Sequence, residues 1–126
     1  MASKEKFTVL VVEDDLLVRL DLVETLQRAG YCTYEAGTAR EAISLLEQHA
    51  EIRVVFTDIE MPGTMDGLAL AHYVRFRWPP TIIVISSGQL RPTQELLPSQ
   101  VDFLAKPYHA RELERVFEDI EKRLTA

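Results

Sequence analysis

Five short apolar segments recur along the chain, and their order constrains the fold more than any other feature of the sequence. They cover residues 7–12, 31–36, 54–57, 82–86 and 101–105. At least the first, third and fourth are continuous apolar runs rather than alternations, which is typical of parallel strands covered by helices on both faces. The pattern therefore predicts an α/β fold around a buried parallel sheet.

Helix-forming segments separate most of these strands. Asp15 and Thr38 are predicted N-caps, and Pro79 ends the third helix because proline lacks the amide proton that a helix interior needs. Helices are predicted over residues 16–29, 38–49, 66–78 and 110–124. Because crossovers between parallel strands are right-handed, this alternation predicts one doubly wound domain with helices on both faces of the sheet.

The stretch between the last two strands departs from the pattern. Gly88, Pro92 and Pro98 interrupt residues 87–100, which leaves room for at most one short helix near residues 93–97. We therefore expect the fourth helix of the alternation to be short or irregular.

The composition is that of an ordinary soluble globule, with 47% hydrophobic and 27% charged residues among 126. No apolar run is long enough to span a bilayer, and the mostly polar lead-in of residues 1–6 lacks the apolar centre of a secretory signal. Both features argue against a membrane and favour the cytoplasm. The net charge of −6 argues against nucleic-acid binding. Cys32, the only cysteine, excludes an internal disulfide and is expected to be a small buried apolar residue.

Polar side chains gather just after the predicted strands. They are Glu13, Asp14 and Asp15 after the first strand, Asp58 and Glu60 after the third, Ser86 at the end of the fourth and Lys106 after the fifth. In a parallel sheet of order 2-1-3-4-5 these strand ends share one edge, and ligands bind where the winding reverses, between the first and third strands. Asp15 is explained by helix capping alone. The other residues predict a site at this edge.

The expected juxtaposition favours metal and phosphoryl chemistry. Glu13 or Asp14 would meet Asp58 across the crevice, and carboxylates held this close are mutually unfavourable unless a cation joins them. Oxygen ligands select a hard cation, and Mg²⁺ suits a site that also holds phosphate. A carboxylate can accept a phosphoryl group when a metal and an ammonium neutralise the added charge. Lys106 can supply the ammonium, and Ser86 a hydroxyl for a phosphoryl oxygen.

These residues resemble the response-regulator receiver domains of two-component signalling, over nearly the whole chain. The resembling segments are the first strand with its acidic pair (residues 9–15), the phosphoacceptor loop (58–63), the turn at Asp66-Gly67 and the terminal signature Lys106-Pro107. The resemblance implies a flavodoxin-like receiver fold with sheet order 2-1-3-4-5. It also implies a single receiver domain over residues 1–126.

The resemblance assigns the acidic residues to phosphorylation and metal binding. Asp58 would be the phosphoacceptor and would share the metal with Glu13 and Asp14. Glu60 would bind the same metal through its backbone carbonyl. The loop of residues 61–67 carries one more residue than the family pattern, so a bulge is expected there.

The resemblance also assigns a switch. Ser86 would be the switch hydroxyl, although the adjacent Ser87 is the other candidate, and Phe103 would be the aromatic whose rotamer reports phosphorylation. Lys106 would contact the phosphate, with a cis bond to Pro107.

By this resemblance the chain would receive its phosphoryl group from a sensor histidine kinase or a histidine phosphotransfer protein. It would signal by altered binding to an unknown downstream protein, as a monomer or weak dimer and without catalytic turnover of a substrate. Leu16, Leu17, Leu20 and Val23 add apolar surface to the first helix, and they either belong to the core or dock the partner's helices.

Two other functions fit parts of the sequence. A phosphorylation-independent adaptor would keep the acidic residues while the altered region between Ser86 and Lys106 holds one conformation. A phosphatase with an aspartyl nucleophile would need an Asp-x-Asp motif after the first strand, and residues 13–15 lack this spacing. The adaptor is therefore the stronger alternative.

Overall fold

The structure is a computed structural model, and it describes residues 6–61, 63, 65–88 and 96–125. Strands and helices alternate along most of these residues. They are β1 (Thr8–Val12), α1 (Leu16–Arg28), β2 (Cys32–Ala36), α2 (Ala39–Gln48), β3 (Ile52–Asp58), α3 (Gly67–Arg77), β4 (Ile82–Ser87), β5 (Val101–Ala105) and α4 (Ala110–Thr125).

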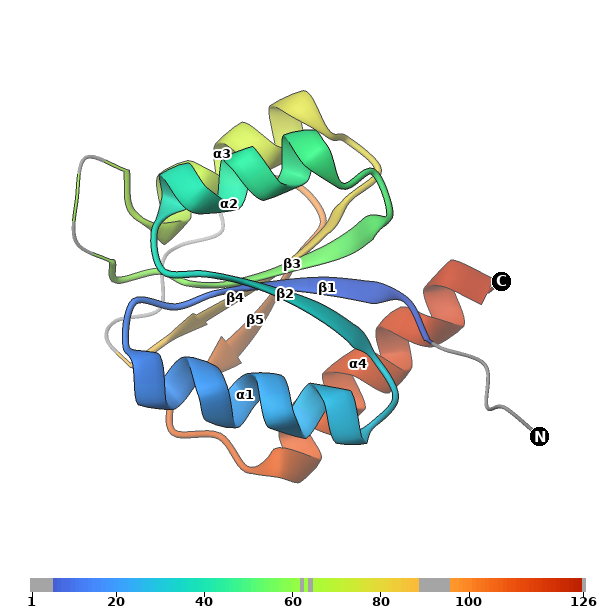
Figure 1. Cartoon of the computed structure of the whole chain (residues 1–126). Coiled ribbons are helices and arrows are strands. Elements are labelled where there is room, and N and C mark those ends of the chain that lie inside the picture. The colour runs from blue at the N-terminus through green and yellow to red at the C-terminus, as the bar shows by residue number, and fades with distance from the viewer. Residues whose placement is uncertain (1–5, 62, 64, 89–95, 126) are drawn as a thin grey trace.

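The described strands form one parallel sheet in the order β2-β1-β3-β4-β5. Helices α1 and α4 cover one face of this sheet, and α2 and α3 cover the other (Figure 1). The predicted fold class and strand order are therefore confirmed. Among the described residues no helix is both long and apolar enough to cross a membrane.

The core has two layers, one on each face of the sheet. Strand β1 supplies both, because Leu10 and Val12 pack toward α2 and α3 whereas Val9 and Val11 pack toward α1 and α4. All four side chains are fully buried. Since successive side chains of a strand point to opposite faces, a strand buried on both faces has to be apolar throughout.

Side-chain caps begin three of the helices. The Asp15 carboxylate accepts from the amides of Leu17 and Val18, the Thr38 hydroxyl from that of Glu41, and the Asp66 carboxylate from that of Ala69. Each cap of this kind stabilises a helix by about 1 kcal/mol. The cap at Asp15 agrees with the expectation that this residue caps the first helix.

The expected short helix near residues 93–97 lies mostly outside the described residues. Side chains of α3 contact Leu96, Ser99 and Gln100, in the described residues just before β5. His72 Nε2 lies 2.6 Å from the carbonyl oxygen of Leu96. The Arg75 guanidinium donates at 2.5–3.1 Å to four carbonyl oxygens, those of Pro79, Thr81, Ser99 and Gln100. Side chains of α3 therefore fix the chain that leads into β5.

Two side chains are less buried than the sequence pattern predicts. Val18 falls at helical spacing from the buried Leu22 and Leu26, yet it is 39% exposed because it lies in the first turn of α1. Cys32 is half-buried rather than buried, because it begins the edge strand β2. Neither difference alters the fold.

Candidate functional site

The strand register brings the predicted site residues to one edge of the sheet. Val12 pairs with Thr57, so the next residues, Glu13 and Asp58, leave β1 and β3 side by side. Asp58 pairs in turn with Ser86 at the end of β4. Residues from three distant parts of the chain therefore meet where the parallel strands end, as expected for this topology.

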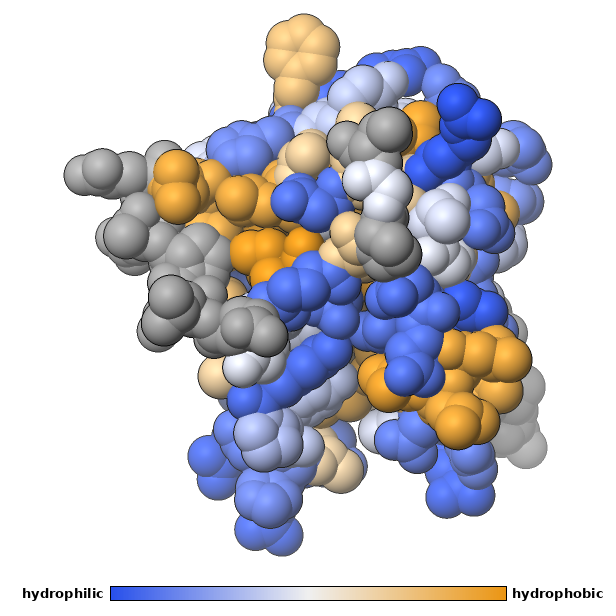
Figure 2. All heavy atoms as spheres, turned by 90° about the vertical axis from the view of Figure 1, so that its left-hand side faces the viewer, coloured by the Kyte–Doolittle hydropathy of each residue, from blue (hydrophilic) through white to orange (hydrophobic). Residues whose placement is uncertain are grey.

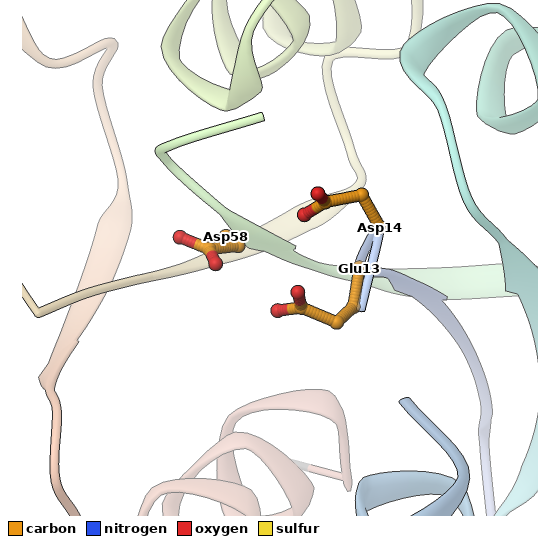
Figure 3. A group of neighbouring side chains, drawn as sticks. All are labelled: Glu13, Asp14 and Asp58. Carbon is orange, nitrogen blue, oxygen red and sulfur yellow. The ribbon is translucent and has the colours of Figure 1, made fainter. Parts of the chain in front are cut away.

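The carboxylates of Glu13, Asp14 and Asp58 form the centre of the site (Figure 3). One carboxylate oxygen from each residue lies within 4.8 Å of the others. Glu13 and Asp58 are only 5% and 6% exposed, whereas Asp14 is exposed. Buried carboxylates in such proximity need a positive charge, and three oxygen ligands with one open side suit a hard divalent cation.

Lys106 supplies part of the required positive charge. Its Nζ lies 2.7 Å from Asp58 Oδ2 and 3.4 Å from Glu13 Oε2. Burial lowers the pKa of Lys106, but the hydrogen bond and charge of Asp58, with help from Glu13, outweigh burial and raise that pKa overall. One ammonium beside a cluster of three acidic side chains leaves an excess of negative charge, which favours a bound cation.

The pKa of Glu13 is unusually high for a carboxylic acid. Burial raises this pKa to about 7, and the hydrogen bond from the Asp15 amide and the charge of Lys106 offset only part of the effect. The Asp15 amide donates to Glu13 Oε1 at 3.1 Å. Near neutral pH, without a cation, this side chain is therefore partly protonated.

Backbone contacts hold Asp58 in place. Its Oδ1 accepts a hydrogen bond of 3.1 Å from the amide of Glu60. Gly67 packs directly against the Asp58 backbone, because a Cβ atom at this position would lie 1.8 Å from the carbonyl oxygen of Asp58. The start of α3 therefore approaches the end of β3 too closely for any residue with a side chain.

The two serines at the end of β4 have different surroundings. Ser86 is 1% exposed, and its hydroxyl oxygen has no hydrogen-bond partner among the residues that the structure describes. A buried hydroxyl without a partner costs about 1–3 kcal/mol, so such a group commonly awaits a ligand or water. The Ser87 hydroxyl instead donates to Glu60 Oε1.

The remaining predicted residues lie around this centre. Glu60 follows β3, and its side chain turns toward Ser87. Phe103 lies on the edge strand β5, paired with Ile85, and packs against the core layer under α2 and α3. The peptide bond between Lys106 and Pro107 is cis.

Sequence reasoning missed one residue next to the acids. Arg19 Nη1 donates to the backbone carbonyl of Glu13 at 2.9 Å, and its Nε donates to Glu35 Oε1 at 3.1 Å. Arg19 thereby joins α1 to the ends of β1 and β2. Its position one helical turn after the Asp15 cap was the available signal, since such a side chain points back toward the loop before the helix.

Comparisons with known proteins agree with this architecture. A family model described as the response regulator receiver domain matches residues 9–118. The chain is 34% identical over 90% of its length to the response regulator protein FleR of Pseudomonas aeruginosa, of which the match covers 23%. It is 35% identical over 84% of its length to the sensor kinase CckA of Brucella abortus, of which the match covers 12%.

Solved structures show the same fold. A signal receiver domain of an HD domain-containing protein from Pseudomonas fluorescens superposes with a TM-score of 0.84 at 22% identity, covering 97% of this chain and all of the other. The chemotaxis protein CheY4 of Vibrio cholerae gives a TM-score of 0.80 at 25% identity, covering 90% of this chain and 97% of the other.

The matches differ in how much of each protein they cover. The chain spans less than a quarter of the length of FleR and CckA, whereas it spans nearly all of the matched receiver structures. The similarity is therefore that of one domain. Because the family model covers most of the sequence and the fold agrees, the chain belongs to the response-regulator receiver domain family.

Proposed function

We propose that this chain is the phosphoacceptor switch of a two-component phosphorelay, with Asp58 as the acceptor. The observation that carries the proposal is the position of the Asp58 carboxylate. It is buried at the end of β3, lies 2.7 Å from an ammonium group and shares its surroundings with two further acids. This arrangement suits a nucleophilic carboxylate whose product carries extra negative charge.

Mg²⁺ is the cation that this site fits best. The ligands would be the carboxylates of Glu13, Asp14 and Asp58 and the backbone carbonyl of Glu60. A set of oxygen atoms without sulfur or imidazole favours a hard cation. When bound, Mg²⁺ would neutralise the charge of the acids and of the transferring phosphoryl group.

In the proposed transfer, one Asp58 oxygen attacks the phosphorus atom of a phosphohistidine on the donor. The new O–P bond forms as the P–N bond breaks, and the imidazole leaves with the electron pair of that bond. The Lys106 ammonium stabilises the charge on the transferring group. The Ser86 hydroxyl, which has no partner among the described residues, donates to a phosphoryl oxygen and thereby becomes paired.

This change at Ser86 would begin the signal. Ser86 and Lys106 move toward the phosphoryl group, and Phe103 reports the movement on the edge strand. Residue pairing supports this link, because Ile85, which precedes Ser86, pairs with Phe103. The output is altered binding to a downstream protein rather than turnover.

The donor would be a sensor histidine kinase or a histidine phosphotransfer protein in the cytoplasm. The apolar surface of α1 is a suitable docking surface for this donor protein. Leu16, Leu17 and Leu20 are 54%, 78% and 47% exposed, whereas Val23 is buried in the core. An apolar patch lies over this part of α1 at the lower right of Figure 2. Because α1 begins three residues after Glu13, a helix docked there would lie next to Asp58.

Phosphorylation by a small-molecule donor tests the proposal. Acetyl phosphate with Mg²⁺ should add one acid-stable, base-labile phosphoryl group to the protein, detectable as a mass increase, and Asp58→Asn should abolish it. Profiling against candidate kinases would then identify the donor. Failure of the wild-type protein to incorporate phosphate from any donor would contradict the proposal.

A phosphorylation-independent adaptor is the second candidate function. The observation that favours it is the fixation of residues 96–100 by Arg75 and His72, which restrains a segment before β5. Beryllofluoride with Mg²⁺ mimics the phosphorylated state and distinguishes the two functions. Amide spectra of Ser86, Phe103 and Lys106 should shift in a switch and remain unchanged in an adaptor.

A further inference from the structure

Two donors hold the acceptor carboxylate, one on each oxygen. The Glu60 amide donates to Asp58 Oδ1 at 3.1 Å, and Lys106 Nζ donates to Oδ2 at 2.7 Å. These donors come from different segments, the loop after β3 and the end of β5. Their relative position therefore depends on whatever joins these two segments.

Ser87 joins them. Its hydroxyl donates to the Glu60 carboxylate, and its carbonyl oxygen accepts from the Lys106 amide at 2.9 Å. Hydrogen bonds and short stretches of chain thus form a closed ring that passes from Asp58 through Glu60, Ser87 and Lys106 back to Asp58. Ser87 is 2% exposed and ends β4 in register with Ala105, so the ring is anchored on the sheet.

Ser87 also controls where the charge of Glu60 lies. Glu60 is only two residues from Asp58, next to a cluster of three acidic side chains of which Lys106 contacts two. A carboxylate accepting a hydrogen bond from a buried hydroxyl is held in one position. Without that bond, the negative charge of Glu60 would be free to approach an incoming anionic phosphoryl group and repel it.

We infer that Ser87 is a positioning residue of the acceptor site, which acts through Glu60. Its hydroxyl fixes the Glu60 side chain, and through it the Glu60 amide that holds Asp58. The inference rests on the proposed phosphoacceptor function. It gives the adjacent serines separate roles: the Ser86 hydroxyl remains available to the phosphoryl group, whereas the Ser87 hydroxyl organises the site around Asp58.

A double-mutant cycle tests whether Ser87 acts through Glu60. The initial rate of phosphorylation by acetyl phosphate at saturating Mg²⁺ should fall about three- to tenfold in Ser87→Ala, as expected for one lost hydrogen bond. In the Glu60→Ala background the same substitution should have no further effect, because its partner is already gone. An unchanged rate in Ser87→Ala, or an equal loss in both backgrounds, would overturn the inference.

A second measurement needs no phosphorylation. Hydrogen exchange of the Glu60 amide in the metal-free protein should be faster in Ser87→Ala and unchanged in the matched variant Ser86→Ala, which removes the neighbouring hydroxyl. Equal exchange in both variants would overturn the positioning role. If instead exchange responds as expected but acetyl phosphate never modifies the wild-type protein, the proposed function fails while the hydrogen-bonded ring is established.

Discussion

At the scale of the residue, ionisation of Glu13 is unfavourable in the folded protein unless a cation binds beside it. Its carboxyl is buried beside Asp58, and burial raises its pKa to about 7. In the unfolded chain the same group titrates near its ordinary value of 4.5. The native state therefore holds a proton that the unfolded state has lost in the window between these two values.

This difference predicts a dependence of stability on pH. Because the native pKa of Glu13 is raised, its contribution to the free energy of unfolding falls as the pH rises from about 4.5 to 7, by roughly 1–3 kcal/mol. Urea unfolding of the metal-free protein at several pH values should show this decrease, and Glu13→Gln should remove it. Mg²⁺ should restore stability at pH 8 because it binds the ionised form. A wild-type profile parallel to that of Glu13→Gln would contradict the prediction.

At the scale of the element, the close approach of α3 to the end of β3 fixes the backbone of Asp58, the proposed acceptor. Gly67 is the second residue of the Asp66-Gly67 turn and the first of α3, and its amide donates to the carbonyl of Ile59 at 3.1 Å. The absence of a side chain there lets the helix start directly over the Asp58 backbone. The position of Asp58 therefore depends on a neighbouring helix as well as on its own strand.

Gly67→Ala should damage both stability and the site. The added Cβ would lie 1.8 Å from the Asp58 carbonyl oxygen, so either α3 or the end of β3 has to move. We expect a loss of at least about 2 kcal/mol in the free energy of unfolding, with slower phosphorylation of Asp58. Gly88→Ala is the matched control, because its Cβ would make an ordinary contact of 3.6 Å with the Lys106 side chain. Equal stability of the two variants would contradict this explanation.

Much of the fold and site was predictable at the level of elements. Short apolar segments, at least three of them continuous, identified the strands, and polar residues after them identified Glu13, Asp14, Asp58 and Lys106 as one cluster. Strand β3 nevertheless begins at Ile52, two residues before the predicted start, because the exposed Arg53 interrupts its apolar pattern.

Contacts that depend on three-dimensional detail were not predictable. The hydrogen bond between Ser87 and Glu60 joins side chains 27 positions apart, and no pattern in the sequence predicts it. The contacts of Arg75 with backbone carbonyls cannot be predicted from the sequence either. Every residue carries a carbonyl, and only the folded chain determines which ones lie beside the guanidinium.

At the scale of the whole molecule, the acidic cluster and the proposed docking surface occupy separate parts of the protein. The acids lie between the ends of β1 and β3, whereas the exposed leucines lie on the first turns of α1. Under the proposed function, a small phosphodonor would need only the acids and Lys106. A protein donor would need the apolar surface as well, so a change on α1 should distinguish the two kinds of donor.

Leu17→Glu should separate them. Leu17 is 78% exposed, so the substitution should leave stability and phosphorylation by acetyl phosphate unchanged. Transfer from the phosphohistidine of the cognate partner should slow by about tenfold or more, because a charge would be buried in an apolar contact. Phe76→Glu, at a residue 84% exposed on α3, serves as the control for an added surface charge. Equal transfer rates for both variants would place the docking surface elsewhere.

The four carbonyl contacts of Arg75 have a mechanical consequence for the sheet. Pro79 and Thr81 precede β4, and Ser99 and Gln100 precede β5, so a single guanidinium pins the entry points of both strands to α3. The opposite tips, which carry Ser86, Ser87 and Lys106, have no such restraint from Arg75. Any displacement that starts at Asp58 would then pivot about the N-terminal ends of β4 and β5. The displacement would be greatest at their C-terminal ends, beside the acids.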